Sequence, residues 1–292
     1  MNVFLTGATG YIGSVVAEPV IASGHSVTGL ARSDAAAGQM SLKGVTPWRG
    51  DLTSPAALAE AVKAADGVIH AGTTNDGRLD REAVRSMLDA LLGSGKPFIY
   101  TSGIWLLGNT GEKPADESEA LNPIALVAWR PAVEAMVLDS AKHGVRAIVI
   151  RPAIVFGLGG GIPADLVKSA RETGAARYVG DGQNRWPMVH VRDLADLFAR
   201  ALDRAAPGTL LHAADDTAFR VKEIAEAASD AAGTEGRTSS WPLDEARKSL
   251  GAYADALVLD QRISSERAKT TLGWNPREKS VVEDLRHGSY LL

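Results

Sequence analysis

The chain has 292 residues, of which 45% are hydrophobic and 23% charged, an ordinary composition for a soluble globular protein of one large domain, or of one domain with a smaller lobe. The formal net charge of −4 gives no reason to expect nucleic acid or an anionic membrane as a partner. Cysteine is absent from the sequence, which excludes disulfides, thiolate nucleophiles and cysteine-bound zinc. The chain opens on a strand pattern and has no apolar stretch long enough to span a bilayer, so we expect a cytoplasmic protein.

The first expected strand, residues 3–6, runs directly into three glycines spaced three apart, and a helical pattern follows over residues 14–22. A glycine-rich turn between a strand and a helix lets the backbone approach a pyrophosphate closely, and the helix N-terminus supplies N–H donors. We therefore expect a dinucleotide to bind at Gly7, Thr9, Gly10, Tyr11, Ile12 and Gly13. The alternative is a tight turn without a ligand.

Strand and helix patterns alternate through the rest of the first half. Further strands are expected at residues 26–31, 45–49, 68–71, 98–101 and 147–151. Further helices are expected at residues 55–65, 80–92 and 124–143, with Pro19 kinking the first helix and the alanine run 35–37 forming a surface turn. Near-continuous apolar strands separated by helices predict an α/β fold with a doubly wound parallel sheet of the Rossmann type, covered by helices on both faces.

The pattern changes after residue 152. A glycine-rich turn at 157–161 is followed by less regular segments, an amphipathic helix at 191–202, a short strand at 210–213 and mostly helical sequence from residue 220 onward. His190 and Asp193 are expected to fix the start of the helix at 191. We expect residues 1–155 to form a dinucleotide-binding domain, to which residues 186–213 return. Residues 156–185 and 214–292 are expected to form a smaller C-terminal substrate lobe.

The end of the second strand indicates which dinucleotide binds. An acidic side chain at this place would bind the ribose 2′-hydroxyl, but the chain has Arg32 and Ser33 there. A guanidinium suits a 2′-phosphate, so NADP(H) is favoured over NAD(H); the alternative is that Arg32 is a solvated surface residue. Other expected cofactor contacts are Asp51 and Leu52 after the third strand and Ala71, Gly72 and Thr73 after the fourth.

Six motifs occur in a characteristic order. They are TGATGYIG at 6–13, GDL at 50–52, VIHA at 68–71, RPAIVFG at 151–157, VHVRDLA at 189–195 and LGWNP at 272–276. Over nearly its whole length the chain resembles an extended, atypical short-chain dehydrogenase/reductase of the NAD-dependent epimerase/dehydratase superfamily. The resemblance implies a nicotinamide cofactor at the carboxyl edge of the sheet and a substrate lobe from the second half.

The chain departs from this family at the residues that transfer the proton. Family members carry a Tyr four residues before a Lys, and these positions fall at Leu126 and Arg130. The resemblance implies that Arg130 can hold the ribose hydroxyls as a fixed cation, in a cofactor site that also includes Thr101 and Pro152. Leu126 cannot donate a proton, so the usual Tyr-x-x-x-Lys pair is missing.

The catalytic Ser of the family falls at Gly103, directly after Thr101 and Ser102. We expect Ser102, Thr101 and Arg130 to be the catalytic residues, with Ser102 and a water molecule in the acid role. Tyr253 and His190 are other candidate proton donors. The alternative for Ser102 is a hydroxyl that satisfies the local backbone at a strand end.

Three aromatic residues, Trp105, Trp186 and Tyr253, are candidates to contact the substrate in an apolar pocket, although each could instead be core packing. The spacing of His, Asp and Glu predicts no metal site.

The leading hypothesis is an NADP(H)-dependent oxidoreductase that acts on a small, fairly apolar carbonyl compound or alcohol without the usual Tyr acid. The alternatives are a non-catalytic NADP(H)-binding sensor or scaffold and an epimerase or dehydratase for a sugar-like substrate, the latter disfavoured by the replaced Tyr and Lys. The expected partner is a small molecule, with neither nucleic acid nor membrane, and the family expectation is a homodimer.

Overall fold

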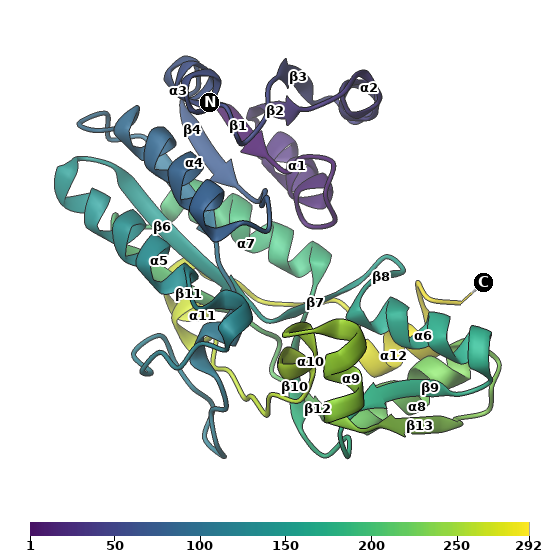
Figure 1. Cartoon of the computed structure of the whole chain (residues 1–292). Coiled ribbons are helices and arrows are strands. Elements are labelled where there is room, and N and C mark those ends of the chain that lie inside the picture. Colours follow the sequence, from purple (N-terminus) through teal and green to yellow (C-terminus); the bar gives the residue numbers. More distant parts are fainter. Residues whose placement is uncertain (292) are drawn as a thin grey trace.

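Seven parallel strands form the central sheet of the computed structural model, which describes residues 1–291 (Figure 1). The strand order is β11-β6-β5-β4-β1-β2-β3. These strands are β1 (Asn2–Thr6), β2 (Ser26–Ala31), β3 (Thr46–Arg49), β4 (Gly67–His70), β5 (Pro97–Thr101), β6 (Arg146–Pro152) and β11 (Thr209–Ala213). The order reverses between β1 and β4, which leaves a crevice beyond the carboxyl ends of those strands. The expected doubly wound α/β fold is confirmed.

Helices cover both faces of this sheet because its strands are apolar on both sides. In β1, Val3 and Leu5 belong to one buried cluster, and Phe4, which points to the opposite face, belongs to another. The first cluster includes α1 (Gly13–Ala22) and α7 (Val191–Arg204). The second includes α3 (Pro55–Ala64), α4 (Gly77–Asp89) and α5 (Arg130–Asp139).

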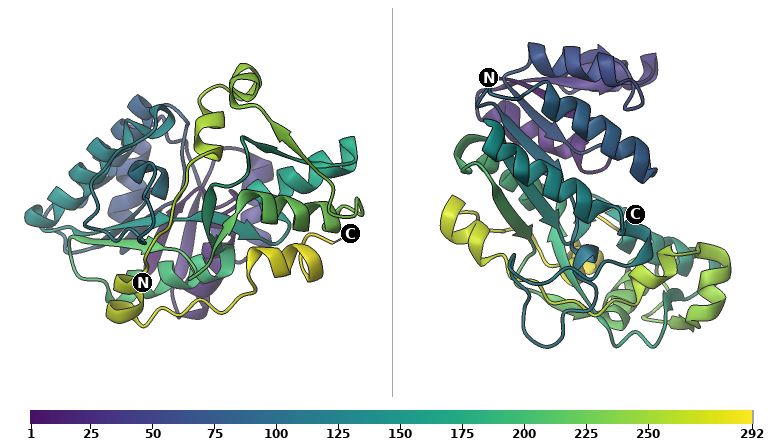
Figure 2. Two further views of the ribbon diagram at one scale, coloured as in Figure 1. Left: turned by 90° about the horizontal axis from the view of Figure 1, so that it is seen from below. Right: turned by 60° about the vertical axis from the view of Figure 1, so that its left-hand side comes forward.

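A smaller lobe lies beside one end of the sheet in all three views (Figures 1 and 2). Its four-stranded sheet has the order β12-β10-β7-β8, and β13 pairs with β9. Its strands are β7 (Ile154–Gly157), β8 (Gly160–Gly161), β9 (Ala176–Val179), β10 (Arg185–His190), β12 (Ala218–Arg220) and β13 (Thr238–Trp241). Its helices are α6 (Ile162–Thr173), α8 (Val221–Ala231), α9 (Leu243–Leu250), α10 (Tyr253–Leu257) and α12 (Val281–His287).

The boundary between the two parts differs from the expected one at two places. Residues 186–190, expected to return to the dinucleotide-binding domain, lie in β10 and stay with the smaller sheet because β10 pairs with β7. The segment containing α11 (Glu266–Leu272), expected in the lobe, packs instead against α7 and β11 of the large sheet. Trp274 ends this segment with its ring buried and its indole N–H donated to the Asp193 carbonyl at 2.8 Å.

Two local expectations were wrong. Residues 35–37 lie in a helix, α2 (Asp34–Leu42), whose start is capped by the Ser33 hydroxyl; among its side chains only Met40 is buried, so no apolar pattern revealed it. The expected helix 124–143 is divided into the 3₁₀ turn η2 (Ala125–Val127), α5 and the 3₁₀ turn η3 (Ser140–His143). Pro131 has no N–H to bond to the Val127 carbonyl, so the α-helix begins only at Arg130.

Two other local features follow the sequence more closely. The helix α1 continues past Pro19 to Ala22. His190 caps α7 as expected, because its Nδ1 accepts a hydrogen bond from the Arg192 N–H at 3.2 Å. Asp193 differs, since its carboxylate accepts from the N–H groups of Arg277 and Glu278 and ties that later segment to α7. Among residues 1–291, no helix combines the length and apolar character that a bilayer crossing requires.

Candidate active site

A groove of about 700 Å³ lies at the carboxyl ends of β1, β2 and β4. Its walls include most of the residues that the sequence assigned to a cofactor: Gly7, Thr9, Gly10, Tyr11, Ile12, Arg32, Ser33, Asp51, Leu52, Ala71, Gly72 and Thr73. It is completed by Leu30, Ala35, Ala36, Gln39 and Thr74. Sequence reasoning missed the contacts from α2 because it did not predict that helix.

The glycine turn has the shape that a pyrophosphate needs. Gly7 adopts a φ of 72°, and a Cβ there would lie 2.6 Å from the Ala71 carbonyl oxygen. Gly10 is exposed and has only the Gly7 oxygen near its Cβ position, so its surface stays open to the groove. Gly13 does not line the groove; it lies behind the turn, where a Cβ would be 2.2 Å from the Gly7 oxygen. The turn therefore fits a dinucleotide.

Buried side chains hold the β4 end of the groove. The Thr6 hydroxyl lies 2.7 Å from His70 Nδ1 and accepts the Gly72 N–H at 3.1 Å. Burial lowers the pKa of His70 to about 4, so this ring is neutral at pH 7. Asp80, which the sequence did not single out, is buried and accepts hydrogen bonds from the hydroxyls of Thr73 and Thr74 at 2.5 and 2.6 Å. It fixes the loop that forms this wall.

At the other end of the groove, the expected nucleotide-selecting residues are exposed. Arg32 has neither an ion-pair nor a hydrogen-bond partner within the part of the chain that the structure describes, which leaves its guanidinium available. Ser33 is engaged as the cap of α2. Hydrogen bonds from Thr53, and to a lesser degree the charge of Arg32, hold the pKa of Asp51 below its ordinary value, so this wall carries a carboxylate beside a guanidinium.

A second, mostly apolar cavity of about 260 Å³ adjoins the groove, and both include Tyr11 and Ile12 in their walls. Its other lining residues are Ser102, Gly103, Ile104, Trp105, Leu106, Val127, Arg130, Pro152, Ala153, Ile154, Val155, Gly161 and Ile162. These residues come from the segment that follows β5, the turns η1 (Ile104–Leu107) and η2, α5, β6, the β7–β8 hairpin and the start of α6. The cavity therefore lies where the sheet meets the lobe.

Hydroxyl groups at the end of β5 are left without partners. Within residues 1–291, Thr101 Oγ1 and Ser102 Oγ are both buried and lack hydrogen bonds, although the Ser102 N–H is bonded to the Ile150 carbonyl at 2.8 Å. The alternative in which the Ser102 hydroxyl satisfies the local backbone is therefore not observed. A buried hydroxyl without a partner is unfavourable. A hydrogen bond between the Ser102 hydroxyl and a ligand atom in the cavity would therefore need no existing bond to be broken.

Arg130 reaches the same place from α5. Its Nη1 donates to the Thr101 carbonyl at 3.2 Å and lies 3.4 Å from the Tyr100 hydroxyl, whose pKa burial raises to about 12. One turn later, Glu134 forms a buried ion pair with Arg151 at 2.5 Å, which fastens α5 to β6. Leu126, which the sequence comparison placed at the position of the family's Tyr, lies in η2 and is 38% exposed.

The three aromatic candidates differ in position. Trp105 lines the cavity. Tyr253 does not; its ring packs edge-on against Trp105, with ring centroids 6.1 Å apart, and burial raises its pKa to about 12. Trp186 was wrongly expected at the substrate, because it is buried in the core of the lobe and donates its indole N–H to the Leu257 carbonyl at 3.2 Å. His190, engaged as a helix cap, does not line the cavity either.

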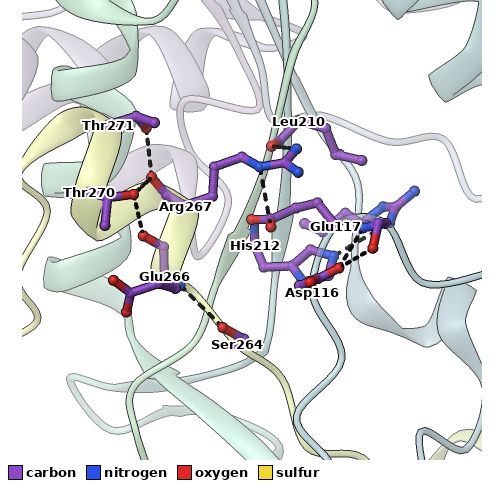
Figure 3. A network of polar contacts seen from close by, with 11 residues as sticks. Asp116, Glu117, Leu210, His212, Ser264, Glu266, Arg267, Thr270 and Thr271 are labelled. Atoms are coloured by element: carbon purple, nitrogen blue, oxygen red, sulfur yellow. Dashed lines mark hydrogen bonds and ion pairs between the residues drawn. The ribbon is translucent and has the colours of Figure 1, made fainter.

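A buried network supports the loop that precedes η2 (Figure 3). Glu117 accepts the His212 N–H at 2.8 Å and lies 3.5 Å from Arg267 Nε. Burial, aided by the charge of Arg151, lowers the pKa of His212 to about 4. The network joins residues 116–117, β11 and α11. No three His, Asp or Glu side chains among residues 1–291 come together as a metal site requires.

A dinucleotide groove that opens into an apolar cavity on a doubly wound sheet defines the class of NAD(P)-dependent enzymes of reductase or epimerase type. The comparisons with known proteins agree. The family model described as NAD dependent epimerase/dehydratase family matches residues 3–212, and the chain belongs to this family.

Particular relatives extend over nearly all of the molecule. An uncharacterized protein of Saccharomyces cerevisiae is 35% identical over 300 residues, which cover 98% of each chain. A decarboxylating sterol-4-alpha-carboxylate 3-dehydrogenase of Dictyostelium discoideum is 25% identical over 245 residues, covering 76% of this chain and 74% of that one. The structure of a UDP-glucose 4-epimerase of Thermus thermophilus in complex with NAD covers 99% of both chains with a TM-score of 0.81 and 20% identity, which shows a shared fold.

Proposed function

We propose that this chain is an NADP(H)-dependent oxidoreductase that acts on a small, fairly apolar carbonyl compound or the corresponding alcohol. The observation that carries the proposal is the junction of the two spaces: the groove and the apolar cavity share Tyr11 and Ile12, and the cavity contains the unpartnered Ser102 hydroxyl and Arg130. A cavity of about 260 Å³ limits the part of the substrate that it encloses to a small one. The Dictyostelium relative, by name a dehydrogenase of a sterol carboxylate, supports an apolar substrate.

The preference for NADP(H) rests on Arg32. It lines the groove at the end of β2, where a carboxylate would select NAD(H), and its guanidinium is exposed there. A planar guanidinium can donate two parallel hydrogen bonds to a phosphate.

The chain's own residues must polarise the carbonyl and keep bulk water out. The bound cofactor would supply or accept the hydride. Ser102 Oγ would donate a hydrogen bond to the carbonyl oxygen, and a water molecule would deliver the proton, because Leu126 cannot. Arg130, held by the Thr101 carbonyl, would place a positive charge beside the developing negative charge and hold ribose hydroxyls. Thr101 Oγ1 is a second hydroxyl within this end of β5.

A second candidate function is a non-catalytic NADP(H)-binding sensor or scaffold. The observation that favours it is the position of Leu126, which is apolar, partly exposed and outside the cavity. An epimerase or dehydratase for a sugar-like substrate is less well supported, because the cavity is mostly apolar. We further propose a cytoplasmic location, with a small molecule as the partner rather than nucleic acid or a membrane.

One experiment separates these functions. The purified protein is mixed with NADPH and a panel of aldehydes, ketones and imines, and the absorbance of the reduced nicotinamide is followed. The control is Gly10→Asp, whose carboxylate would occupy the pyrophosphate position. Oxidation that is lost in the control supports the oxidoreductase. Tight NADPH binding without turnover across the panel would instead support the sensor.

A further inference from the structure

The β7–β8 hairpin lines the cavity and contacts Tyr11, a residue that the cavity shares with the groove. Gly157 and Gly160 lie opposite each other in this hairpin, and Gly161 lines the cavity. The Tyr11 hydroxyl donates to the Gly157 carbonyl at 2.7 Å, and its ring lies so close to Gly160 that a Cβ there would be 2.4 Å from the ring. Tyr11, like Ile12, lines both spaces. The position of the hairpin therefore decides the position of Tyr11.

One hydroxyl from a distant part of the chain bridges the two strands of the hairpin. The Tyr290 hydroxyl accepts the Gly157 N–H at 2.8 Å and donates to the Gly160 carbonyl at 2.6 Å. Gly157 is thus bonded to Tyr290 through its N–H and to Tyr11 through its carbonyl. Only glycine fits these positions, since a Cβ on Gly160 would meet the Tyr11 ring and Gly157 has a φ of 104°.

Tyr290 is itself fixed from two sides. It is 5% exposed, and its carbonyl accepts a hydrogen bond from Arg171 of α6 at 3.3 Å. The preceding residue, Ser289, donates its hydroxyl to the buried Asp284 carboxylate of α12 at 2.8 Å and accepts the Gly159 N–H at 3.1 Å. Figure 1 shows the segment after α12 running beside β8. The lobe helices α6 and α12 therefore hold the hydroxyl that shapes the hairpin.

We propose that Tyr290 is a positioning residue for the junction of the cofactor groove and the substrate cavity, and that it acts through Gly157 on Tyr11. This inference rests on the proposed function insofar as the groove is taken to bind NADP(H). Removing the Tyr290 hydroxyl leaves the Gly157 N–H and the Gly160 carbonyl without a buried partner, so the hairpin must shift and release Tyr11. The groove and the cavity should then both lose their common wall.

The test is a double-mutant cycle with Tyr290→Phe, Tyr11→Phe and the combined variant, read out as the dissociation constant for NADPH from nicotinamide fluorescence. We expect each single variant to weaken NADPH by about tenfold, the size of one lost hydrogen bond. If Tyr290 acts through Tyr11, the combined variant should be no weaker than the singles. Full affinity in a folded Tyr290→Phe, or single effects that multiply in the combined variant, would overturn the proposal.

A matched control removes a buried hydroxyl elsewhere in the lobe. The Ser229 hydroxyl of α8 lies 2.6 Å from that of Thr234 and contacts neither the hairpin nor Tyr290, so Ser229→Ala should lower stability without changing NADPH affinity. If Tyr290→Phe does not fold, Ser289→Ala replaces it in the cycle, with a smaller loss and the same non-additivity.

Amide exchange distinguishes this inference from the proposed function. If the wild-type protein binds no NADPH, the proposed cofactor is wrong, but Tyr290→Phe should still speed hydrogen exchange at the Gly157 amide relative to Ser229→Ala, because that N–H loses its acceptor. Unchanged exchange at the Gly157 amide would refute the positioning role.

Discussion

The groove and the cavity meet at Tyr11 and Ile12, yet they are built in different ways. The groove is made largely of backbone and small side chains at the ends of β1 and β4, from four short stretches of the first 74 residues. The cavity is made of side chains from both halves of the chain, from Tyr11 to Ile162. Glycine conformations set the shape of the groove, whereas the identity of the lining side chains sets the chemical character of the cavity.

This difference makes the groove more demanding of particular residues than the cavity. A pyrophosphate is bound by N–H groups and by the absence of Cβ atoms, so few sequences will serve. A cavity tolerates many combinations of apolar residues, and here it contains the Ser102 hydroxyl and the Arg130 guanidinium. The sequence therefore indicates the fold and the cofactor groove more directly than the reaction.

The largest effect should come from a Cβ in the groove turn. Gly7→Ala places a side chain at a φ of 72° and 2.6 Å from the Ala71 oxygen, so we expect a loss of about 2 kcal/mol in the free energy of unfolding and no measurable NADPH binding. The matched change in the cavity is Gly103→Ala, where a Cβ meets nothing within 4 Å. It should keep stability and NADPH affinity. Denaturant unfolding measures stability, and fluorescence titration measures NADPH affinity. Equal losses in the two variants would contradict the view that the groove, unlike the cavity, depends on glycine.

Acid should act on two buried histidines, His70 beside the groove and His212 in β11. The pKa values of His70 and His212 are lowered to about 4 by burial, so protonation below the unfolded value near 6.5 favours the unfolded state. The contribution of the two neutral histidines to the free energy of unfolding should be fully present above about pH 6.5. It should fall toward pH 4, by about 1–2 kcal/mol per histidine at pH 5. Asp215, whose pKa burial raises to about 6, opposes this trend, because its folded form binds its proton more tightly.

The contribution of His212 can be measured from the difference between the unfolding free energies at pH 7 and pH 5 in a variant that lacks this histidine. In His212→Gln the amide oxygen can still accept from Arg151 but does not titrate, so the difference between the two pH values should shrink by about 1–2 kcal/mol. An unchanged difference would show that His212 does not titrate as its burial predicts.

Charge reversal at Arg32 should lower the affinity for NADPH far more than the affinity for NADH. Arg32→Asp should weaken NADPH by about 30-fold through loss of charge-assisted hydrogen bonds and leave NADH nearly unchanged. Arg49→Asp is the control, because Arg49 pairs with Asp34 on the surface outside the groove. Isothermal titration calorimetry measures the dissociation constants of both cofactors. An equal loss of affinity for NADPH and NADH would exclude a 2′-phosphate site at Arg32.

The smallest expected effect comes from the hydroxyl in the cavity. Ser102→Ala should lower kcat/KM by about tenfold and leave the NADPH dissociation constant unchanged, because the Ser102 hydroxyl lies in the cavity and not in the groove. Thr101→Val tests the neighbouring hydroxyl in the same assay. Unaltered turnover in Ser102→Ala would leave the carbonyl to be polarised by Arg130 and water.

The large sheet and the groove could be predicted from the sequence, because local backbone geometry demands the turn at Gly7 and Gly10 and the small residues after β4. The sequence pattern did not reveal α2, whose pattern of burial is too weak, or the break before Pro131. The burial of Trp186 in the core and the hydrogen bonds that Asp80 accepts from the groove wall follow from tertiary packing. The same is true of the contact between Tyr290 and the hairpin, since packing between segments far apart in the chain leaves no local pattern to read.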